Sequence, residues 1–343
     1  MTGKKQGKGA NAEEAMRQRF RQMGYFAVRG IPYSFREFSV TDIDLWLYGP
    51  AGVFRERINV DIKNKRTPQA IERIFWTLGA MQVLKLDRCI VVTPETNPAV
   101  LDFGKRCNVT VIDGHCLKAI MAEAPADCLT EEEFAVAVRP ADAEEKAKEF
   151  QRRYEGAKKR LLTHFSFDGC NLHLLDIRKC MEDLTAYPGM AASARRMLYV
   201  LVSYLTVTLD HLLSKAAFTD LGACCREVEL GLRYGSSGRN RLDEFSRILE
   251  GCRTADNEDA NRVINGIIAR LQAGATELRT DIVAEYSVRQ VGPGKLLELG
   301  RAFEQVAYAR ECPSIAGLQT DLKSAIMMLV DFCGFDRTRA MKW

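Results

Sequence analysis

The chain has 343 residues, enough for two domains of ordinary size that each bury a core. A hydrophobic share of 47% and a charged share of 27% exclude a disordered or collagen-like chain. The longest apolar run, residues 197–209, is shorter than the roughly 20 residues that cross a bilayer. The N-terminal MTGKKQGKG is followed by no apolar stretch, so it does not resemble a secretory signal. We therefore expect a cytoplasmic protein with no membrane-spanning segment.

The first 122 residues predict an α/β domain. Residues 1–9 are rich in Lys and Gly and predict a flexible basic tail. A helix is expected from Ala10 to a stop at Gly24, followed by three strands that are separated by turn residues, the last turn being 49–52. These strands cover residues 25–28, 42–48 and 57–63. The next expected elements are a helix over 67–84, a strand over 88–93, a helix over 98–107 and a strand over 109–112. This order predicts a central mixed sheet flanked by helices in a domain spanning residues 10–122.

The rest of the chain predicts a connector and a helical domain. Residues 123–149 are rich in Ala, Glu, Asp and Pro, which is typical of a connector or a loosely attached helix. From 150 to 343 we find no convincing strand, and apolar residues recur at steps of three and four. The helical pattern is clearest in segments 190–218, 222–250, 258–275 and 297–310. We expect an all-α bundle over residues 150–343.

Charge is unevenly distributed between these parts. Residues 1–122 hold 19 Lys and Arg against 12 Asp and Glu, a net charge of +7, whereas residues 123–149 hold 3 against 9, a net charge of −6. A basic domain followed by an acidic connector suits a polyanionic partner for the first domain. An ordinary solvated surface of mixed charge explains the numbers equally well.

The eleven cysteines do not predict a disulfide or zinc framework. They are scattered from Cys89 to Cys333 without a CxxC pair, and several lie among apolar residues, as Cys89 does in DRCIVV. His115-Cys116 has no second pair at ligand spacing. The pattern favours buried, reduced thiols.

Four residues of the first domain share one chemical explanation. Asp61 and Lys63 lie on the third strand, and because side chains alternate along a strand they should share one face. Asp44, on the second strand, is as far from the turn as Asp61, so the two carboxylates should be cross-strand neighbours in an antiparallel hairpin. Glu13, on the first helix, is placed to close the cluster.

Such a cluster suits hydrolysis of a phosphodiester bond. The carboxylates of Asp44 and Asp61, with the backbone carbonyl of Ile62 and with Glu13 nearby, are ligands for a hard cation such as Mg²⁺ or Mn²⁺. The metal would activate a water, and Lys63 would orient it or stabilise developing negative charge. A lone DxK is common and usually marks solvated charges on a strand, but Asp-x₁₆-DxK across a predicted hairpin is more specific.

Two stretches resemble known nuclease domains. Residues 8–29, KGANAEEAMRQRFRQMGYFAVR, resemble the opening of archaeal Holliday junction resolvases, in which a KG-x-x-AE helix leads to a strand. Residues 89–120, with CIVVT and VIDGHCL, are similar to the end of Mrr-like restriction endonuclease domains. Together the resemblances cover about residues 8–120 and imply the PD-(D/E)xK nuclease superfamily and its restriction-endonuclease-like fold.

The resemblance implies roles for individual residues, and the chain also departs from the family's motif. It implies that Glu13, Asp44, Asp61 and Lys63 are the catalytic residues, with Asp61 where the family most often has Glu. The QxK motif of the family is absent, since residues 59–65 read NVDIKNK. Asp42 is an alternative to Asp44 as the metal ligand, because both side chains should face the same side of the strand. Gln82 resembles a Gln that often lines these sites, although a helix-surface Gln is the commoner reading.

Basic residues near the cluster are candidates for contacts with a phosphate backbone. They are Arg29, Arg36, Arg55, Arg57, Lys65, Arg66 and Arg73. A mixed surface with ordinary ion pairs is the alternative. A second basic run, over residues 152–160, has the pattern of a solvated helix face.

These patterns predict a Mg²⁺-dependent DNA endonuclease, acting as a restriction or phage-defence effector. The alternatives are a structure-selective resolvase and a catalytically silent protein that binds DNA or a partner while keeping the fold. Residues 191–218 and 296–306 are apolar over much of the helix circumference. Burial inside the bundle explains this, and so does an interface with a second copy or a partner protein.

Overall fold

The computed structural model describes residues 8–52, 54–65, 69–124, 126–140, 143–215, 220–253, 257–291 and 295–343. The chain divides into two compact units. Unit 1 comprises residues 1–163, 192–204 and 300–312, and unit 2 comprises residues 164–191, 205–299 and 313–343. The division therefore differs from the expected boundaries at 122 and 150, because two segments from the second half of the chain belong to the unit that contains the sheet.

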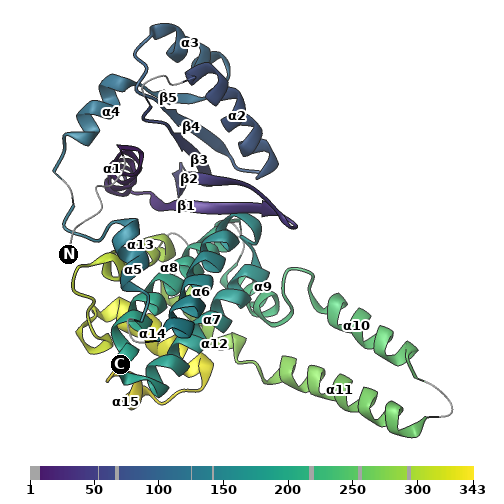
Figure 1. The fold of residues 1–343 in the computed structure, drawn as a ribbon. Helices are drawn as coiled ribbons and strands as arrows, with labels where there is room; N and C mark the ends of the chain where they lie inside the picture. Colours follow the sequence, from purple (N-terminus) through teal and green to yellow (C-terminus); the bar gives the residue numbers. More distant parts are fainter. Residues whose placement is uncertain are drawn as a thin grey trace. The chain divides into compact units, whose positions relative to one another are not determined.

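Unit 1 is built on a five-stranded mixed sheet in the order β1-β2-β3-β4-β5 (Figure 1). The strands are β1 (Phe26–Phe35), β2 (Phe38–Ala51), β3 (Phe54–Ile62), β4 (Arg88–Val92) and β5 (Thr110–Ile112). The pairs β1·β2 and β2·β3 are antiparallel, and β3·β4 and β4·β5 are parallel. The mixed sheet and the order of helices and strands along the chain agree with the sequence prediction, which did not extend to the order of strands within the sheet.

The first two strands are longer than expected. Their pairing runs to Phe35 and Phe38 at the hairpin, whereas β2 pairs with β3 only from Leu45 onward. At the other end β2 and β3 stay paired to Ala51 and Phe54, so most of the predicted turn 49–52 is strand. The β1–β2 hairpin consequently extends as a two-stranded ribbon beyond the end of β3.

Helices cover both faces of the sheet. On one face, α1 (Lys8–Gln22) and α4 (Gly114–Met121) enclose a core that includes Met16 and Phe20 of α1 and the inward side chains of β2 and β3. On the other face, α2 (Ala70–Val83) and α3 (Pro98–Arg106) pack over Cys89 and Val91 of β4. Because buried strands alternate their side chains between two covered faces, polar residues on them are rare.

The segment expected as an acidic connector is part of the packed structure. Residues 131–137 form α5 (Glu131–Ala137) and residues 144–163 form α6 (Glu144–Thr163). Phe134 and Phe150 are fully buried. A capping box between Thr130 and Glu133 fixes the start of α5, which accounts for part of the acidic composition.

A buried ion network joins α1 to the helices that follow the sheet. Arg17 donates to Glu14 at 2.7 Å and lies 3.5 Å from Glu304, in the part of α13 (Lys295–Tyr308) that belongs to unit 1. Lys158 of α6 donates to Glu131 of α5 at 2.7 Å. Buried charges are stable only when they are paired, so these contacts specify how the helices pack in unit 1.

Within the described residues of unit 2, every element of regular secondary structure is a helix. It contains α7 (Phe167–Ala186), α9 (Leu221–Tyr234), α10 (Arg239–Gly251), α11 (Glu258–Glu277), α12 (Thr280–Glu285), α14 (Thr320–Cys333) and α15 (Arg337–Ala340). Short turns of other helix types cover Pro188–Met190, Tyr286–Val291 and Ile315–Gly317. The prediction that no strand follows residue 150 is confirmed for the described residues.

Helix α8 (Ala191–Lys215) contains the thirteen-residue apolar run, residues 197–209, that the sequence shows. The segment Pro188–Ser214 is long and apolar enough to cross a membrane by length and composition, but 89% of its most apolar window is buried inside the protein. In α13, Leu296 and Phe303 are also buried. Burial within the chain therefore explains the apolar character of residues 191–214 and 296–306, for which a subunit interface was the alternative explanation; residues 216–218 of the first stretch lie outside the described residues.

The cysteines are all free thiols. Cys89 is buried in β4, and burial raises the pKa of its thiol to about 11. Such a thiol stays protonated at neutral pH and is unreactive. The expectation of buried thiols holds for four of the eleven cysteines, whereas five are partly buried and Cys116 and Cys252 are exposed.

Candidate active site

Strand register places Asp44 beside Asp61. Leu45 of β2 is paired with Val60 of β3 in an antiparallel ladder, so the next position along sets Asp44 opposite Asp61. Val60 and Ile62 pack in the core under α1. Asp61 therefore faces the opposite side of the sheet, where α2 begins.

Lys63 bridges the two carboxylates. Its Nζ lies 2.9 Å from Oδ2 of Asp44 and 3.7 Å from Oδ1 of Asp61. The backbone N–H of Ile62 also donates to Oδ2 of Asp44, at 2.8 Å. Asp44, Asp61 and Lys63 thus form one cluster just after the end of β3, which is the juxtaposition that strand alternation and hairpin symmetry predict.

A second cation, Arg73 of α2, engages Asp61. Its Nε donates to Oδ2 of Asp61 at 2.8 Å and its second terminal nitrogen contacts Oδ1, while Asp61 is only 4% exposed. The guanidinium also lies over the Trp76 ring, 4.7 Å from its centroid. Burial lowers the pKa of Arg73, but the hydrogen bond to Asp61 and the charges of Asp61 and Asp44 outweigh it and raise the pKa.

Glu13 borders the cluster and is held by Arg29. Its Oε2 accepts from Arg29 at 2.9 Å. Burial raises the pKa of Glu13 more than Arg29 lowers it, and the nearby charges of Asp44 and Lys63 act on it in opposite directions. Groups whose pKa is shifted by burial and by neighbouring charges cluster at functional sites.

The cluster has the donor chemistry of a site for a hard divalent cation. The carboxylates of Asp44 and Asp61 converge on a single ammonium, and carboxylate and carbonyl oxygens are the ligands that Mg²⁺ and Mn²⁺ prefer. In the arrangement seen here, however, Arg73 takes up both oxygens of Asp61. Among the described residues, no group of three or more His, Cys, Asp or Glu is arranged to hold a metal ion. The cluster therefore has oxygen ligands of the kind that suits such a cation, but Arg73 occupies both oxygens of Asp61 in this structure.

Gln82 does not join the cluster. It is an exposed residue near the C-terminal end of α2, whereas Arg73, which contacts Asp61, lies in the first turn. Nine residues of helix separate the two by about 13 Å. Sequence reasoning could place Gln82 in this helix but could not set which end of the helix faces the carboxylates.

Two of the candidate phosphate-binding arginines, Arg29 and Arg73, form ion pairs with carboxylates of the protein. Arg29 is 3% exposed and pairs with Glu13, Glu14 and Glu132 at 2.9, 2.7 and 3.1 Å. This corrects the expectation of a DNA contact, because a phosphate backbone cannot reach a guanidinium buried among three carboxylates. Arg73 forms a salt bridge with Asp61.

The remaining candidates have varied surroundings. Arg57 donates to the carbonyl of Lys85 at 2.6 Å, and Arg55 is half-buried. Arg36 and Lys65 are exposed, Arg36 at the tip of the β1–β2 ribbon. Arg66 lies outside the described residues.

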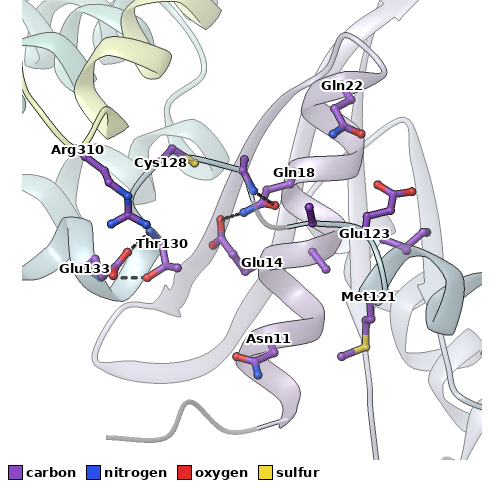
Figure 2. A pocket seen from close by; sticks show the side chains of 14 residues that line it. Asn11, Glu14, Gln18, Gln22, Met121, Glu123, Cys128, Thr130, Glu133 and Arg310 are labelled. Carbon is purple, nitrogen blue, oxygen red and sulfur yellow. Dashed lines mark hydrogen bonds between the residues drawn. The ribbon is translucent and has the colours of Figure 1, made fainter. Parts of the chain in front are cut away.

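A cavity of about 300 Å³ lies beside α1 (Figure 2). Gln18 of α1 projects into it, donates to Glu14 and accepts from the backbone of Ala126 at 3.1 Å. None of the residues lining the cavity belongs to the set Asp44, Asp61 and Lys63. Gln18 thus connects α1 to the segment before α5, and the three cluster residues do not line this cavity.

Sequence analysis did not predict that Arg73 pairs with Asp61, or that Glu14, which follows Glu13, is buried. Arg73 was one of several basic residues, and only the position of α2 shows that it reaches Asp61. Glu14 is buried against Arg17 and Arg29. Glu14 lies between the apolar residues Ala12 and Met16, and this local pattern does not indicate that Arg29 of β1 pairs with it.

Comparison of the chain with family models, with curated proteins and with solved structures found no match.

Proposed function

We propose that this protein is a Mg²⁺-dependent DNA endonuclease of the PD-(D/E)xK type, with its active site in unit 1. The observation that carries the proposal is the convergence of Asp44, Asp61 and Lys63 at the end of an antiparallel pair of strands. The cluster lies in an α/β unit whose chain order is a helix, three strands that pair antiparallel, and then two strands that pair in parallel. Resemblance of residues 8–120 to nuclease domains supports the same conclusion.

Each residue of the cluster has a role that its position allows. Asp44 and Asp61 would hold the cation, together with the carbonyl of Ile62, and Glu13 would border the site. When bound, the cation offsets charge on the scissile phosphate and lowers the pKa of a coordinated water. Lys63 supplies a positive charge beside the reacting phosphate, where negative charge develops in the transition state.

DNA is the substrate that the surroundings favour. Arg36 and Lys65 are exposed at the end of the sheet where β3 terminates. The β1–β2 ribbon, which carries Arg36, extends past the cluster at this end. Phe35 and Phe38 are exposed at the tip of this ribbon, and the Arg36 guanidinium lies 5.5 Å from the centroid of the Phe35 ring. Ribbons of this kind enter DNA grooves, and exposed aromatic side chains stack on bases.

The test is incubation of the pure full-length protein with supercoiled, linear and branched DNA, with Mg²⁺ or with chelator. We expect Mg²⁺-dependent cleavage that Asp61→Asn and Lys63→Ala abolish, while DNA binding stays near the wild-type level because the basic surface supplies the affinity. Asp102→Asn is the matched control, since Asp102 forms an exposed pair with Lys105 away from the cluster. Wild-type cleavage by either cluster variant would refute the proposal. Preference for branched DNA would identify a resolvase.

One observation favours a second candidate, a protein that keeps this fold without turnover. The carboxylates of the cluster are already neutralised by Lys63 and Arg73, so the fold has no need of a cation. DNA binding without cleavage under every metal tested would support this candidate.

Cutting both strands of a duplex would use two active sites, which a symmetric dimer provides. Because α8 and α13 bury their apolar residues within the chain, the exposed apolar residues of α10 and α11 are the better candidates for self-association. They include Phe245, Ile248, Val263 and Ile267. Light scattering of the full chain and of Ile248→Glu tests this. A monomer that linearises plasmid without a nicked intermediate would contradict it.

A further inference from the structure

The salt bridge of Arg73 has a consequence for metal binding, which rests on the proposed function. Asp61 is the more buried of the two carboxylates and Arg73 contacts both of its oxygens. Lys63 lies between Asp44 and Asp61. The two negative charges are therefore balanced by two positive charges, without any metal.

A divalent cation that entered this arrangement would meet two obstacles. It would add two positive charges beside Arg73 and Lys63, and it would have to compete for Asp61 oxygens that already accept charge-assisted hydrogen bonds. Bidentate Arg–carboxylate pairs are among the strongest of such bonds. The free protein should consequently bind Mg²⁺ or Mn²⁺ weakly.

A DNA phosphate removes both obstacles. It brings negative charge to the cluster, and a guanidinium binds phosphate with the same paired geometry that it uses for carboxylate. Arg73 has room to change partners, because a quarter of its side chain is exposed and its other neighbour is the ring of Trp76. A cation–π contact tolerates sliding of the guanidinium over the ring.

We propose that Arg73 couples metal binding to substrate: it occupies Asp61 in the free protein and releases it when a phosphodiester of DNA accepts its guanidinium. Metal and DNA then bind cooperatively, and each raises the affinity for the other by the same factor. The free protein is thereby kept from holding an active metal centre.

The experiment is titration calorimetry of the full-length protein with Mn²⁺ alone. Removing the guanidinium with Arg73→Gln should strengthen Mn²⁺ binding about tenfold, which corresponds to about 1.4 kcal/mol. The double variant Arg73→Gln with Asp61→Asn should lose this gain. Arg88→Gln is the matched control, because Arg88 also pairs with a carboxylate, Glu56, at 2.9 Å but lies away from the cluster.

A second arm measures the effect of DNA. Ca²⁺ has the same preference for oxygen ligands, so its affinity is measured with and without a short DNA duplex. Wild-type protein should bind Ca²⁺ more tightly with the duplex, and Arg73→Gln should show little of this increase. Arg73→Lys, which keeps the charge but not the paired geometry, should fall between them and serves if Arg73→Gln proves unstable in thermal unfolding.

The outcomes separate this proposal from the nuclease assignment. If Arg73→Gln binds Mn²⁺ no more tightly than wild type, or if wild type binds Mn²⁺ tightly and DNA adds nothing, coupling through Arg73 is refuted while a metal-dependent nuclease stands. If no variant binds Mn²⁺ or Ca²⁺ with or without duplex, the metal-dependent function itself is overturned.

Discussion

Replacing Arg29 by Met should destabilise the protein by about 3 kcal/mol, because removal of one partner from a buried ion group costs roughly 3 to 5 kcal/mol. The structure places the cost at the low end of this range. Glu14 would keep its contact with Arg17 at 2.7 Å, and the side chains of Glu13 and Glu132 are 25% and 46% exposed and can be hydrated. The apolar Met fills much of the space that the arginine side chain vacates.

Urea unfolding followed by circular dichroism measures this loss, with Arg36→Met as the control. Arg36 is exposed, and substitutions at such positions usually change stability by less than about 0.5 kcal/mol. The salt dependence of DNA binding separates the two roles further, because each phosphate contact contributes about 0.9 to the slope of log K against log salt. We expect Arg36→Met to reduce the slope and Arg29→Met to leave it unchanged. An Arg29→Met protein as stable as wild type with a reduced slope would show that the buried network has been misassigned.

Three further outcomes are expected. Gln82→Ala should cleave plasmid at the wild-type rate, since Gln82 lies at the far end of α2 from Arg73; a loss beyond tenfold would place it in the site. Burial raises the pKa of Glu131, but the Lys158 ammonium and hydrogen bonds outweigh it and bring the pKa from 4.5 to about 2. The stability this contributes, about 3 kcal/mol, is present above pH 4.5 and lost as pH falls toward 2. Urea unfolding between pH 6 and 3 should show less of this loss in Glu131→Gln, and equal losses would refute the assignment. Finally, chelator should leave the melting temperature of the free protein unchanged, because Lys63 and Arg73 balance the carboxylates; a fall of several degrees would mean that a metal supports the fold.

The sequence predicts the central elements of unit 1 because their signals are local. Alternation of side chains places Asp61 and Lys63 on one face, and equal distances from a turn bring Asp44 opposite Asp61. Both arguments use fewer than 25 consecutive residues. The order of the helices and strands follows from the same short-range periodicities.

Long-range packing decides the features that the sequence could not show. Arg29 has the local setting of a surface cation in a basic domain, yet Glu132, more than 100 residues later, helps to bury it. Arg17 meets Glu304 across a still longer separation. Composition gave residues 123–149 the character of a connector, because it counts the acidic residues and cannot reveal that Phe134 and Glu131 anchor a buried network.

The balance of charge in the cluster explains how a site suited to a cation can form without one. Two carboxylates at adjacent positions of neighbouring strands repel each other, and their burial adds a desolvation cost. Lys63, two residues from Asp61 on the same face, offsets this within the strand, and Arg73 offsets it from α2. Folding can therefore be completed by residues of the chain alone. A residue that stabilises the metal-free cluster necessarily opposes metal binding, so the same contact that helps the sheet to form also gives the substrate a means of controlling the site.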